Sequence, residues 1–250
     1  MRSRSAMLWM LALICSLPVT NRAQAEKTEP ENSKFPMTQS PTYNLEKAEK
    51  LARELRGKGI RDKAVLAAIA RIPREAFVDE ALAEMAYLDR PLPIAEGQTI
   101  SQPYTVAMQT ELLQLEPGDR VLEIGTGGGY QAAVLCEMGV ELYSIERYEE
   151  LYQTARETLN RLGYFPKLYH GDGYEGLPRE ASFDKILITA APETIPPKLK
   201  EQLRVGGLMV LPLGGRERQQ MTVVKRVSET RYSTSTHGDY IFVPMKKGTE

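Results

Sequence analysis

Cysteine and histidine are scarce in this chain. Its 250 residues include two cysteines, Cys15 and Cys136, and two histidines, His170 and His237. Catalytic zinc and similar metals are held mainly by these side chains together with carboxylates, so we expect no metal site. If the N-terminal segment that contains Cys15 is removed, a disulfide within the chain is excluded as well.

A surplus of charge of either sign is also absent. The chain has 32 basic and 33 acidic residues, and loss of its first 25 residues would remove three arginines and no acidic residue, leaving a net charge of −4. Proteins that bind nucleic acid usually carry a basic surplus, so we expect no nucleic-acid partner. The sequence also lacks the G-x-S-x-G motif of α/β hydrolases.

The N-terminal apolar run, Ala6–Val19, is too short to cross a bilayer, because a spanning helix needs about 20 residues. It follows two arginines and precedes small residues at Ala23 and Ala25, which is the pattern of a secretory signal peptide. We therefore expect residues 1–25 to be a signal peptide and the mature protein to be exported, most simply to a periplasm, without stable membrane association. An uncleaved anchor or a misassigned start is the alternative.

The rest of the chain divides by composition. Residues 26–42 are polar and interrupted by proline, which favours a flexible lead-in. Residues 43–250 are expected to form a single domain. Within it, we assign residues 43–100 to a helical lobe and a substrate loop, residues 101–215 to an α/β core, and residues 216–250 to C-terminal strands.

The lobe has helical periodicity. Apolar residues from Leu45 to Leu55 share one face, Asn44 can cap the start, and a second helix is expected around Val65–Ala70. Residues 73–89 are expected to be mostly helical. Residues 90–104 contain three prolines and are expected to be irregular, ahead of a helix over residues 103–115 that starts at a proline.

From residue 117 onward, strand and helix patterns alternate. Strands are expected at 120–125, 140–146, 167–172, 183–190 and 208–214, and helices at 130–138, 149–163 and 196–204. This alternation predicts βαβ units and a doubly wound, Rossmann-like, mainly parallel sheet. No helix is visible after Gly214, so residues 219–227, 232–236 and 239–245 predict antiparallel edge strands.

Ligands of such sheets bind beyond the carboxyl ends of the strands. One loop there holds Gly125, Thr126, Gly127 and Gly129 between a strand and a helix, where glycines let a ligand approach the backbone. The neighbouring strands end at Glu146, suited to ribose hydroxyls, and at Asp172, suited to an adenine edge. The loop over residues 189–197 is a candidate wall of the site.

Two nucleotide ligands fit this pattern. Residues 127–132 match the G-x-G-x-x-A fingerprint of dinucleotide binding, with Glu146 as the later acid, so an NAD(P)-dependent oxidoreductase stays open. Glu123, two residues before Gly125, would repel a pyrophosphate but attract an ammonium group. This favours S-adenosyl-L-methionine, which carries no phosphate.

Several stretches in a fixed order resemble one enzyme family. They are PREAFV, GQTISQPY, VLEIGTGGGYQ, SIER, GDG, FDKILITAAP, GGLMVLPLG and FVPM, spread between Leu45 and Met245. Together they are similar to the protein-L-isoaspartate (D-aspartate) O-methyltransferases, a family of class I S-adenosylmethionine-dependent methyltransferases. The resemblance implies methylation of the carboxyl group of L-isoaspartyl, and of D-aspartyl, residues in damaged proteins, which starts repair through a succinimide. The exported N-terminus departs from the family, which is usually cytoplasmic.

The resemblance also implies site residues. The serine that the family treats as its active-site residue falls on Ser101, with Thr99 beside it. The residues expected to bind the cofactor are Glu123, Gly125, Thr126, Gly127, Gly129, Glu146, Asp172 and Gly173. An aspartyl carboxylate is ionised at neutral pH and needs no general base, so short hydroxyl groups that orient it suffice.

Other interpretations stay open from the sequence. Ser101 can serve only as a cap for the helix that begins at Pro103, and Glu146 can cap the next helix. The chain can also be a non-catalytic binder of damaged proteins. We expect a monomer.

Overall fold

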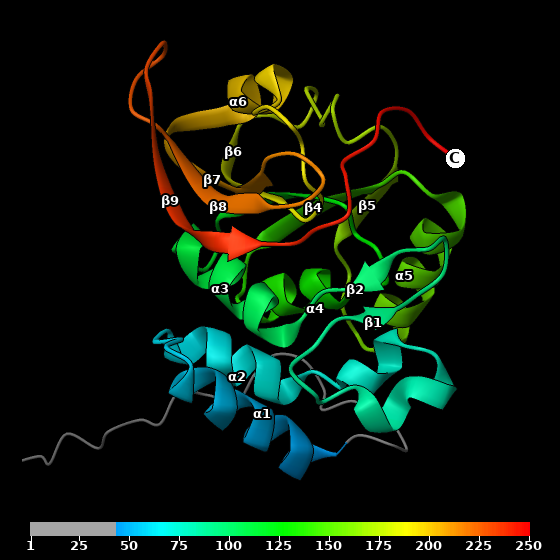
Figure 1. Cartoon of the computed structure of the whole chain (residues 1–250). Coiled ribbons are helices and arrows are strands. Elements are labelled where there is room, and N and C mark those ends of the chain that lie inside the picture. The colour runs from blue at the N-terminus through cyan, green and yellow to red at the C-terminus, as the bar shows by residue number, and fades with distance from the viewer. Residues whose placement is uncertain (1–43) are drawn as a thin grey trace, which may run out of the picture. The chain divides into compact units, whose positions relative to one another are not determined.

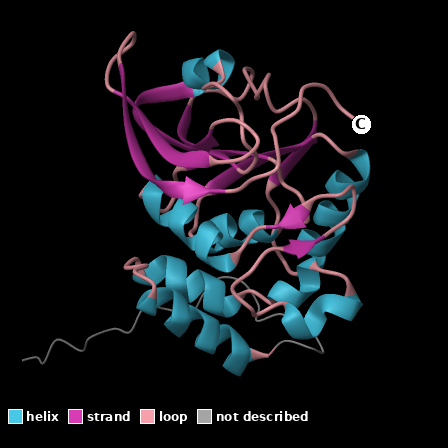
Figure 2. Cartoon of the chain, in the orientation of Figure 1, coloured by secondary structure: helices cyan, strands magenta, loops and turns pink. Residues whose placement is uncertain are grey.

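The computed structural model describes residues 44–250, so the predicted signal peptide (1–25) and lead-in (26–42) lie outside the described residues. Seven strands form the main sheet (Figures 1 and 2). They are β3 (Arg120–Ile124), β4 (Glu141–Glu146), β5 (Lys167–His170), β6 (Phe183–Ile188), β7 (Leu203–Leu213), β8 (Gln219–Arg226) and β9 (Tyr232–Tyr240).

The strand order is β5-β4-β3-β6-β7-β8-β9. Pairing is parallel from β5 to β7 and antiparallel for β7 with β8 and β8 with β9. The chain runs outward from β3 to β5 and then returns to β6 on the other side of β3, which makes the gap between β3 and β6 the switch point of the sheet. The predicted Rossmann-like fold with an antiparallel C-terminal edge is confirmed.

Helices cover the two faces of the sheet unequally. The described α-helices are α1 (Leu45–Gly57), α2 (Lys63–Arg71), α3 (Pro103–Leu113), α4 (Tyr130–Glu137), α5 (Glu149–Arg161) and α6 (Pro197–Gln202). Figure 1 shows α3 and α4 between the sheet and the pair α1 and α2, with α6 across the sheet from them. None of the helices between residues 44 and 250 is long and apolar enough to cross a membrane.

The N-terminal helices begin where the sequence places caps. The side chain of Asn44 accepts a hydrogen bond from Lys47 N at 3.0 Å, and Asp62 caps α2 in the same way. Each such cap satisfies an amide that the helix itself leaves unpaired, and stabilises the helix by about 1 kcal/mol. The predicted helical stretch over residues 73–89 consists of two short 3₁₀ helices, η1 (Arg74–Phe77) and η2 (Glu80–Met85).

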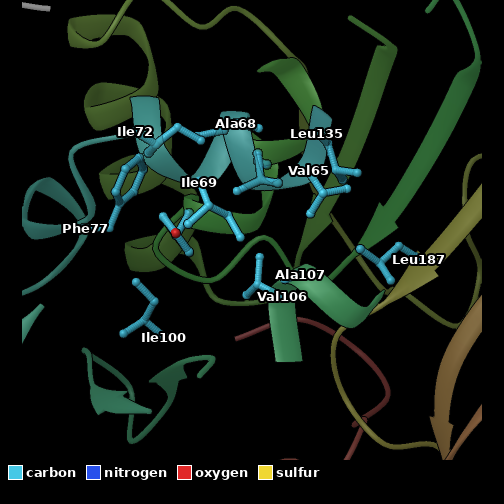
Figure 3. Close-up of a cluster of buried hydrophobic side chains, with 14 of the residues drawn as sticks. Val65, Ala68, Ile69, Ile72, Phe77, Ile100, Val106, Ala107, Leu135 and Leu187 are labelled. Carbon is cyan, nitrogen blue, oxygen red and sulfur yellow. The ribbon is translucent and has the colours of Figure 1, made fainter. Parts of the chain in front are cut away.

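Two apolar clusters fill the space on either side of the sheet. On one side, Val65 and Ile69 of α2 meet Val106 of α3, Leu135 of α4 and Leu187 of β6 (Figure 3). The other cluster contains alternate strand residues together with α6. Because strand side chains alternate between faces, Glu123 and Ser144 fall on the side covered by α4. This placement matters for the candidate site.

The expectation of irregular structure at residues 90–104 is wrong in part. Strands β1 (Leu92–Pro93) and β2 (Thr99–Ile100) form a small antiparallel hairpin. Its turn places Glu96 and Gly97 at positive φ, 54° and 62°, as two-residue hairpin turns require. The prolines argue against a strand in the interior of a sheet, but they are tolerated in a two-stranded edge pair.

The boundary between α6 and β7 also differs from the prediction. We expected a helix to Arg204 that Gly206 and Gly207 terminate, but α6 ends at Gln202 and β7 starts at Leu203. The two glycines lie at a β-bulge in the pairing with β6, and a Cβ at Gly207 would lie 2.7 Å from the carbonyl oxygen of Asp184. The glycines therefore permit close strand approach.

The antiparallel edge is formed by β8 and β9, and the last predicted strand segment, residues 239–245, contributes only its first two residues. The chain then leaves the sheet and crosses the strand ends toward β5 (Figure 1). Residues 243–250 are named the C-terminal strap below. Two hydrogen bonds join the strap to the loop after β6, from Ala191 N to the carbonyl oxygen of Val243 and from Met245 N to that of Ala191, each 2.8 Å.

Candidate active site

A cavity of about 350 Å³ opens at the switch point, beyond the carboxyl ends of β3, β4 and β6. Its volume falls in the range of roughly 300–1,000 Å³ that is usual for small-molecule sites. The β1–β2 hairpin, the glycine-rich loop, the end of β4, the loop after β6 and the C-terminal strap all contribute to its walls. The lining residues are Glu96–Thr99, Ile124, Gly125, Gly127, Ile145–Tyr148, Leu151, Gly173, Thr189, Ala190 and Val243–Lys246.

The glycine-rich loop lies against this cavity without side chains in the way. Gly125, Gly127 and Gly129 all have positive φ, between 54° and 97°. A Cβ at Gly125 would lie 2.5 Å from Thr189 Oγ1, and that hydroxyl donates to the carbonyl oxygens of Ile124 and Gly125. Gly125 and Gly127 line the cavity, where a ligand can approach the backbone as predicted. Gly129 packs against Leu159 of α5 instead.

Glu146 lines the cavity, and its carboxylate joins the glycine-rich loop to the segment that follows β4. Its Oε2 accepts a hydrogen bond from Gly127 N at 2.8 Å, and its Oε1 accepts from Arg147 N and Tyr148 N at 2.8 and 3.0 Å. Carboxylates that accept from backbone amides form strong, charge-assisted bonds. Glu146 is not the cap of α5, because the N-cap residue is Tyr148 and no side chain caps this helix. Oε2 of Glu146 accepts only one of the three bonds and keeps an acceptor site for a ligand.

Glu123 lies elsewhere than we expected. Its side chain is fully buried and is absent from the cavity lining. Ser144 Oγ donates to its Oε2 at 2.5 Å, and Ser144 Oγ lies 2.6 Å from Thr126 Oγ1. Burial raises the pKa of this carboxyl to about 8, and the neighbouring Glu146 adds to the effect. Glu123 therefore does not face the ligand as expected. The acids that line the cavity are Glu146 and, in the β1–β2 hairpin, Glu96.

Asp172 also has a different place from the one expected. Its Oδ1 accepts from Tyr174 N at 2.8 Å and its Oδ2 from Gly248 N at 2.7 Å, and its side chain does not line the cavity. It anchors the C-terminal strap to the loop after β5. Gly173 does line the cavity, and a Cβ there would overlap Ile124.

The strap is a site feature that sequence reasoning missed. Arg147 Nε donates to the carbonyl oxygen of Gly248 at 3.2 Å, and its Nη2 lies 3.1 Å from Glu250 Oε1. The backbones of Glu250, Arg147 and Glu149 are also joined, through two hydrogen bonds of 2.9 Å. Only the similarity of the FVPM stretch pointed to this region, because periodicity carries no signal for a segment fixed by contacts distant in sequence.

A second, larger cavity of about 1,030 Å³ adjoins the first. Ser101 lines it, together with residues of α3, the end of β9 and the segment after β9. Thr99, Thr189 and Val243 line both cavities. Of the two residues with predicted hydroxyl roles, Thr99 therefore lies in the wall that the cavities share, and Ser101 lines the larger cavity only.

Ser101 does not cap α3, which was its alternative role. Tyr104 N, in the first turn of α3, donates to Asp89 Oδ1 at 2.8 Å, and the residue at the N-cap position is Gln102. The backbone of Ser101 is fixed instead by Arg74, whose Nη2 donates to its carbonyl oxygen at 3.0 Å. Ser101 itself lines the larger cavity.

Arg74 is itself a second feature that the sequence did not single out. Its side chain is fully buried, it donates to the carbonyl oxygens of Ala86 and Ser101, and its guanidinium lies 5.3 Å from the ring centroid of Tyr130. Burial lowers its pKa, while nearby Tyr130 and Asp89 oppose the shift. The group therefore links the substrate loop to the first residue of α4, directly after the glycine-rich loop.

The residues around the first cavity fit S-adenosylmethionine better than a dinucleotide. Gly127 N, an amide that a pyrophosphate could use, is occupied by the carboxylate of Glu146, which would repel phosphate. Arg147 and Lys246 line the same cavity as Glu146, so both signs of charge are present for a zwitterionic ligand. Within residues 44–250 no group of three or more histidine, cysteine or acidic side chains is arranged to hold a metal ion.

Comparison with known proteins identifies the family. The model of the family described as protein-L-isoaspartate(D-aspartate) O-methyltransferase matches residues 46–250. The protein-L-isoaspartate O-methyltransferase of Cytophaga hutchinsonii is 50% identical over 196 residues, which cover 78% of this chain and 89% of the relative.

Solved structures show the same fold. A protein-L-isoaspartate O-methyltransferase superposes with a TM-score of 0.73 at 29% identity over 79% of this chain, and the match spans 65% of that longer chain. A Plasmodium falciparum structure assigned to the same enzyme type, in complex with S-adenosyl-L-homocysteine, superposes with a TM-score of 0.70 at 23% identity over 80% of this chain and 99% of that one. The chain belongs to the protein-L-isoaspartate (D-aspartate) O-methyltransferase family.

Proposed function

We propose that this protein transfers a methyl group from S-adenosyl-L-methionine to the free carboxyl group of L-isoaspartyl residues in damaged proteins, with D-aspartyl residues as a further substrate. The observation that carries the proposal is the junction of two cavities: a small one that fits the methyl donor and a large one that fits a peptide, with Thr99, Thr189 and Val243 in the wall between them. The names of the relatives support the same activity.

The cofactor would be held by groups already in place. Gly125, Gly127 and Gly173 leave room against the backbone, Glu146 offers carboxylate lone pairs, and Arg147 and Lys246 offer cationic groups. S-adenosyl-L-methionine supplies a methyl group bound to a positively charged sulfur. The hairpin tip and the C-terminal strap cover the cavity and limit its access to water, which favours reaction between opposite charges.

The substrate carboxylate needs orientation more than activation. It is ionised at neutral pH, and a strong cation beside it would stabilise the ground state and slow its attack. Thr99 in the shared wall and Ser101 in the larger cavity are neutral hydrogen-bond donors, so they can align the carboxylate without that cost. Arg74 does not enter the reaction; it fixes the backbone of Ser101 through the carbonyl oxygen.

We also propose that the protein acts outside the cytoplasm as a monomer. The apolar run followed by Ala23 and Ala25 supports export.

The activity is tested with the full mature chain, a synthetic isoaspartyl peptide and its normal aspartyl counterpart. We expect labelled methyl from S-adenosylmethionine to be incorporated into the isoaspartyl peptide only. Calorimetric titrations with S-adenosylhomocysteine and with NADH accompany the assay. Binding of NADH alone would reverse the assignment in favour of an oxidoreductase, and binding of the peptide without transfer would indicate a non-catalytic binder.

Removal of the Ser101 hydroxyl should slow turnover. We expect Ser101→Ala to lower kcat by about three- to tenfold, the equivalent of one hydrogen bond of roughly 0.5–1.5 kcal/mol, with little change in the affinity for S-adenosylhomocysteine. Thr99→Val should act in the same direction. Ser233→Ala, on exposed β9 and outside both cavities, serves as the control. A wild-type kcat in Ser101→Ala contradicts the orienting role.

Loss of the Glu146 carboxylate should weaken cofactor binding. We expect Glu146→Ala to raise the Kd for S-adenosylhomocysteine by about ten- to a hundredfold, since hydrogen bonds to a charged group contribute roughly 1.5–3 kcal/mol. Its melting temperature should also fall, because three backbone amides lose their acceptor. Glu157→Ala, an exposed acid of α5, is the matched control. An unchanged Kd removes Glu146 from the site.

Export and assembly are tested on protein purified from its native host. We expect the mature chain to begin at Glu26, to be recovered outside the cytoplasm, and to have the mass of one chain by light scattering. A cytoplasmic protein that retains Met1 would refute export, and a stable dimer would refute the monomer.

A further inference from the structure

The buried acid beneath the glycine-rich loop has no role in the chemistry described above. Glu123 is the fourth residue of β3, and its register partners are Ser144 on β4 and Leu187 on β6. Its exposed fraction is 0%. One strand residue later, Ile124 lines the cavity, so Glu123 points to the opposite side of the sheet, under α4.

A short chain of hydrogen bonds connects this acid to the loop. Ser144 Oγ donates to Glu123 Oε2 at 2.5 Å, and Ser144 Oγ and Thr126 Oγ1 lie 2.6 Å apart. Thr126 stands between Gly125 and Gly127, the two loop glycines that line the cavity. The other oxygen of the carboxyl group, Oε1, is buried without a hydrogen-bond partner.

The groups that face Glu123 offer no compensation for a negative charge. The titratable neighbour on β4 is Glu146, another acid, and the one on α4 is Cys136, whose buried thiol is neutral. The neighbour on β6 is the apolar Leu187. No lysine, arginine or histidine in the described part of the chain forms an ion pair with Glu123.

These surroundings favour the neutral form of the acid. A buried carboxylate without a cation or several donors is far more costly than a buried carboxylic acid, and the single donor here is Ser144. The direction of the pKa shift, raised to about 8 by burial, agrees with the geometry.

We propose that Glu123 is a positioning residue that works as a neutral carboxylic acid, holding the glycine-rich loop from beneath through Ser144 and Thr126, and that it is not the counter-ion of a bound cation. The loop then presents Gly125 and Gly127 to the cavity in a fixed conformation. Counter-charge for the ligand comes from Glu146 alone among the acids of β3 and β4. The cofactor part of this inference rests on the proposed function, but the protonation state does not.

The protonation state is tested without cofactor, by urea unfolding of wild type and Glu123→Gln between pH 5 and pH 8. The native state keeps the proton of Glu123 up to a pH of about 8, whereas the unfolded chain releases it near pH 4–5. The unfolding equilibrium constant of wild type should therefore rise with pH relative to the variant, by at most about tenfold per pH unit. Glu157→Gln should show no such trend.

A flat difference between wild type and Glu123→Gln across this range would overturn the proposal, because it would mean that the native acid is ionised. If the glutamine variant fails to fold, difference infrared spectroscopy of wild type decides the same question. We expect the carbonyl band of a buried protonated carboxyl group at pH 7, absent from any variant that lacks Glu123. Its absence from wild type also contradicts the proposal.

The positioning role is tested by titration with S-adenosylhomocysteine. Glutamine keeps the shape and the acceptor oxygen, so Glu123→Gln should bind within about twofold of wild type, while Ser144→Ala and Glu123→Ala should each weaken binding by about three- to tenfold through the loop. A loss of tenfold or more in Glu123→Gln, at pH values where it is folded, would instead identify a counter-ion. Wild type that does not bind S-adenosylhomocysteine at all defeats the proposed function and leaves the unfolding result intact.

Discussion

The carboxylate of Glu146 accepts hydrogen bonds from Gly127 N, Arg147 N and Tyr148 N, and both cavity loops depend on these bonds. Gly125 N and Thr126 N also donate to the carbonyl oxygen of Ile145, so backbone bonds join the same two segments. A charged acceptor for three backbone amides is a stronger constraint than apolar packing can apply to glycine. The same carboxylate excludes phosphate from the loop, so one group sets both the shape and the ligand class of the cavity.

A second constraint acts from the N-terminal lobe. The guanidinium of Arg74 is buried among backbone carbonyl oxygens and the ring of Tyr130, and desolvation makes such a charge costly unless every neighbour is well placed. Its contacts reach the stretch before the hairpin, the substrate loop at Ser101 and the start of α4. Through Arg74, the N-terminal lobe therefore fixes the backbone of Ser101, which lines the larger cavity.

Much of the fold was predictable from local signals. Asn44 caps α1, the five parallel strands occur where β-like runs alternate with helices, and Gly125, Gly127, Glu146 and Gly173 line the cavity. The predictions that were wrong concern features that depend on tertiary contacts. The hairpin at residues 92–100 pairs only with itself, Gly206 and Gly207 serve a bulge, and Asp172 anchors a strap that comes from 76 residues further along the chain. Spacing within a segment carries no information about such partners.

Glu123 shows that an acidic residue type in a sequence does not fix the charge of its side chain in the fold. From its position two residues before Gly125, Glu123 is expected to be an anion that faces the ligand. Its negative charge then favours S-adenosylmethionine over a dinucleotide. In the fold, strand alternation turns Glu123 away from the cavity and Ser144 becomes its only donor, so burial favours the proton over the charge. The choice of cofactor nevertheless survives, because the next strand ends in Glu146, which takes the loop amide that a pyrophosphate needs. An acidic residue can be a charged carboxylate or a neutral carboxylic acid that only forms hydrogen bonds. The sequence alone does not distinguish the two, because the choice depends on how far the side chain is exposed to solvent.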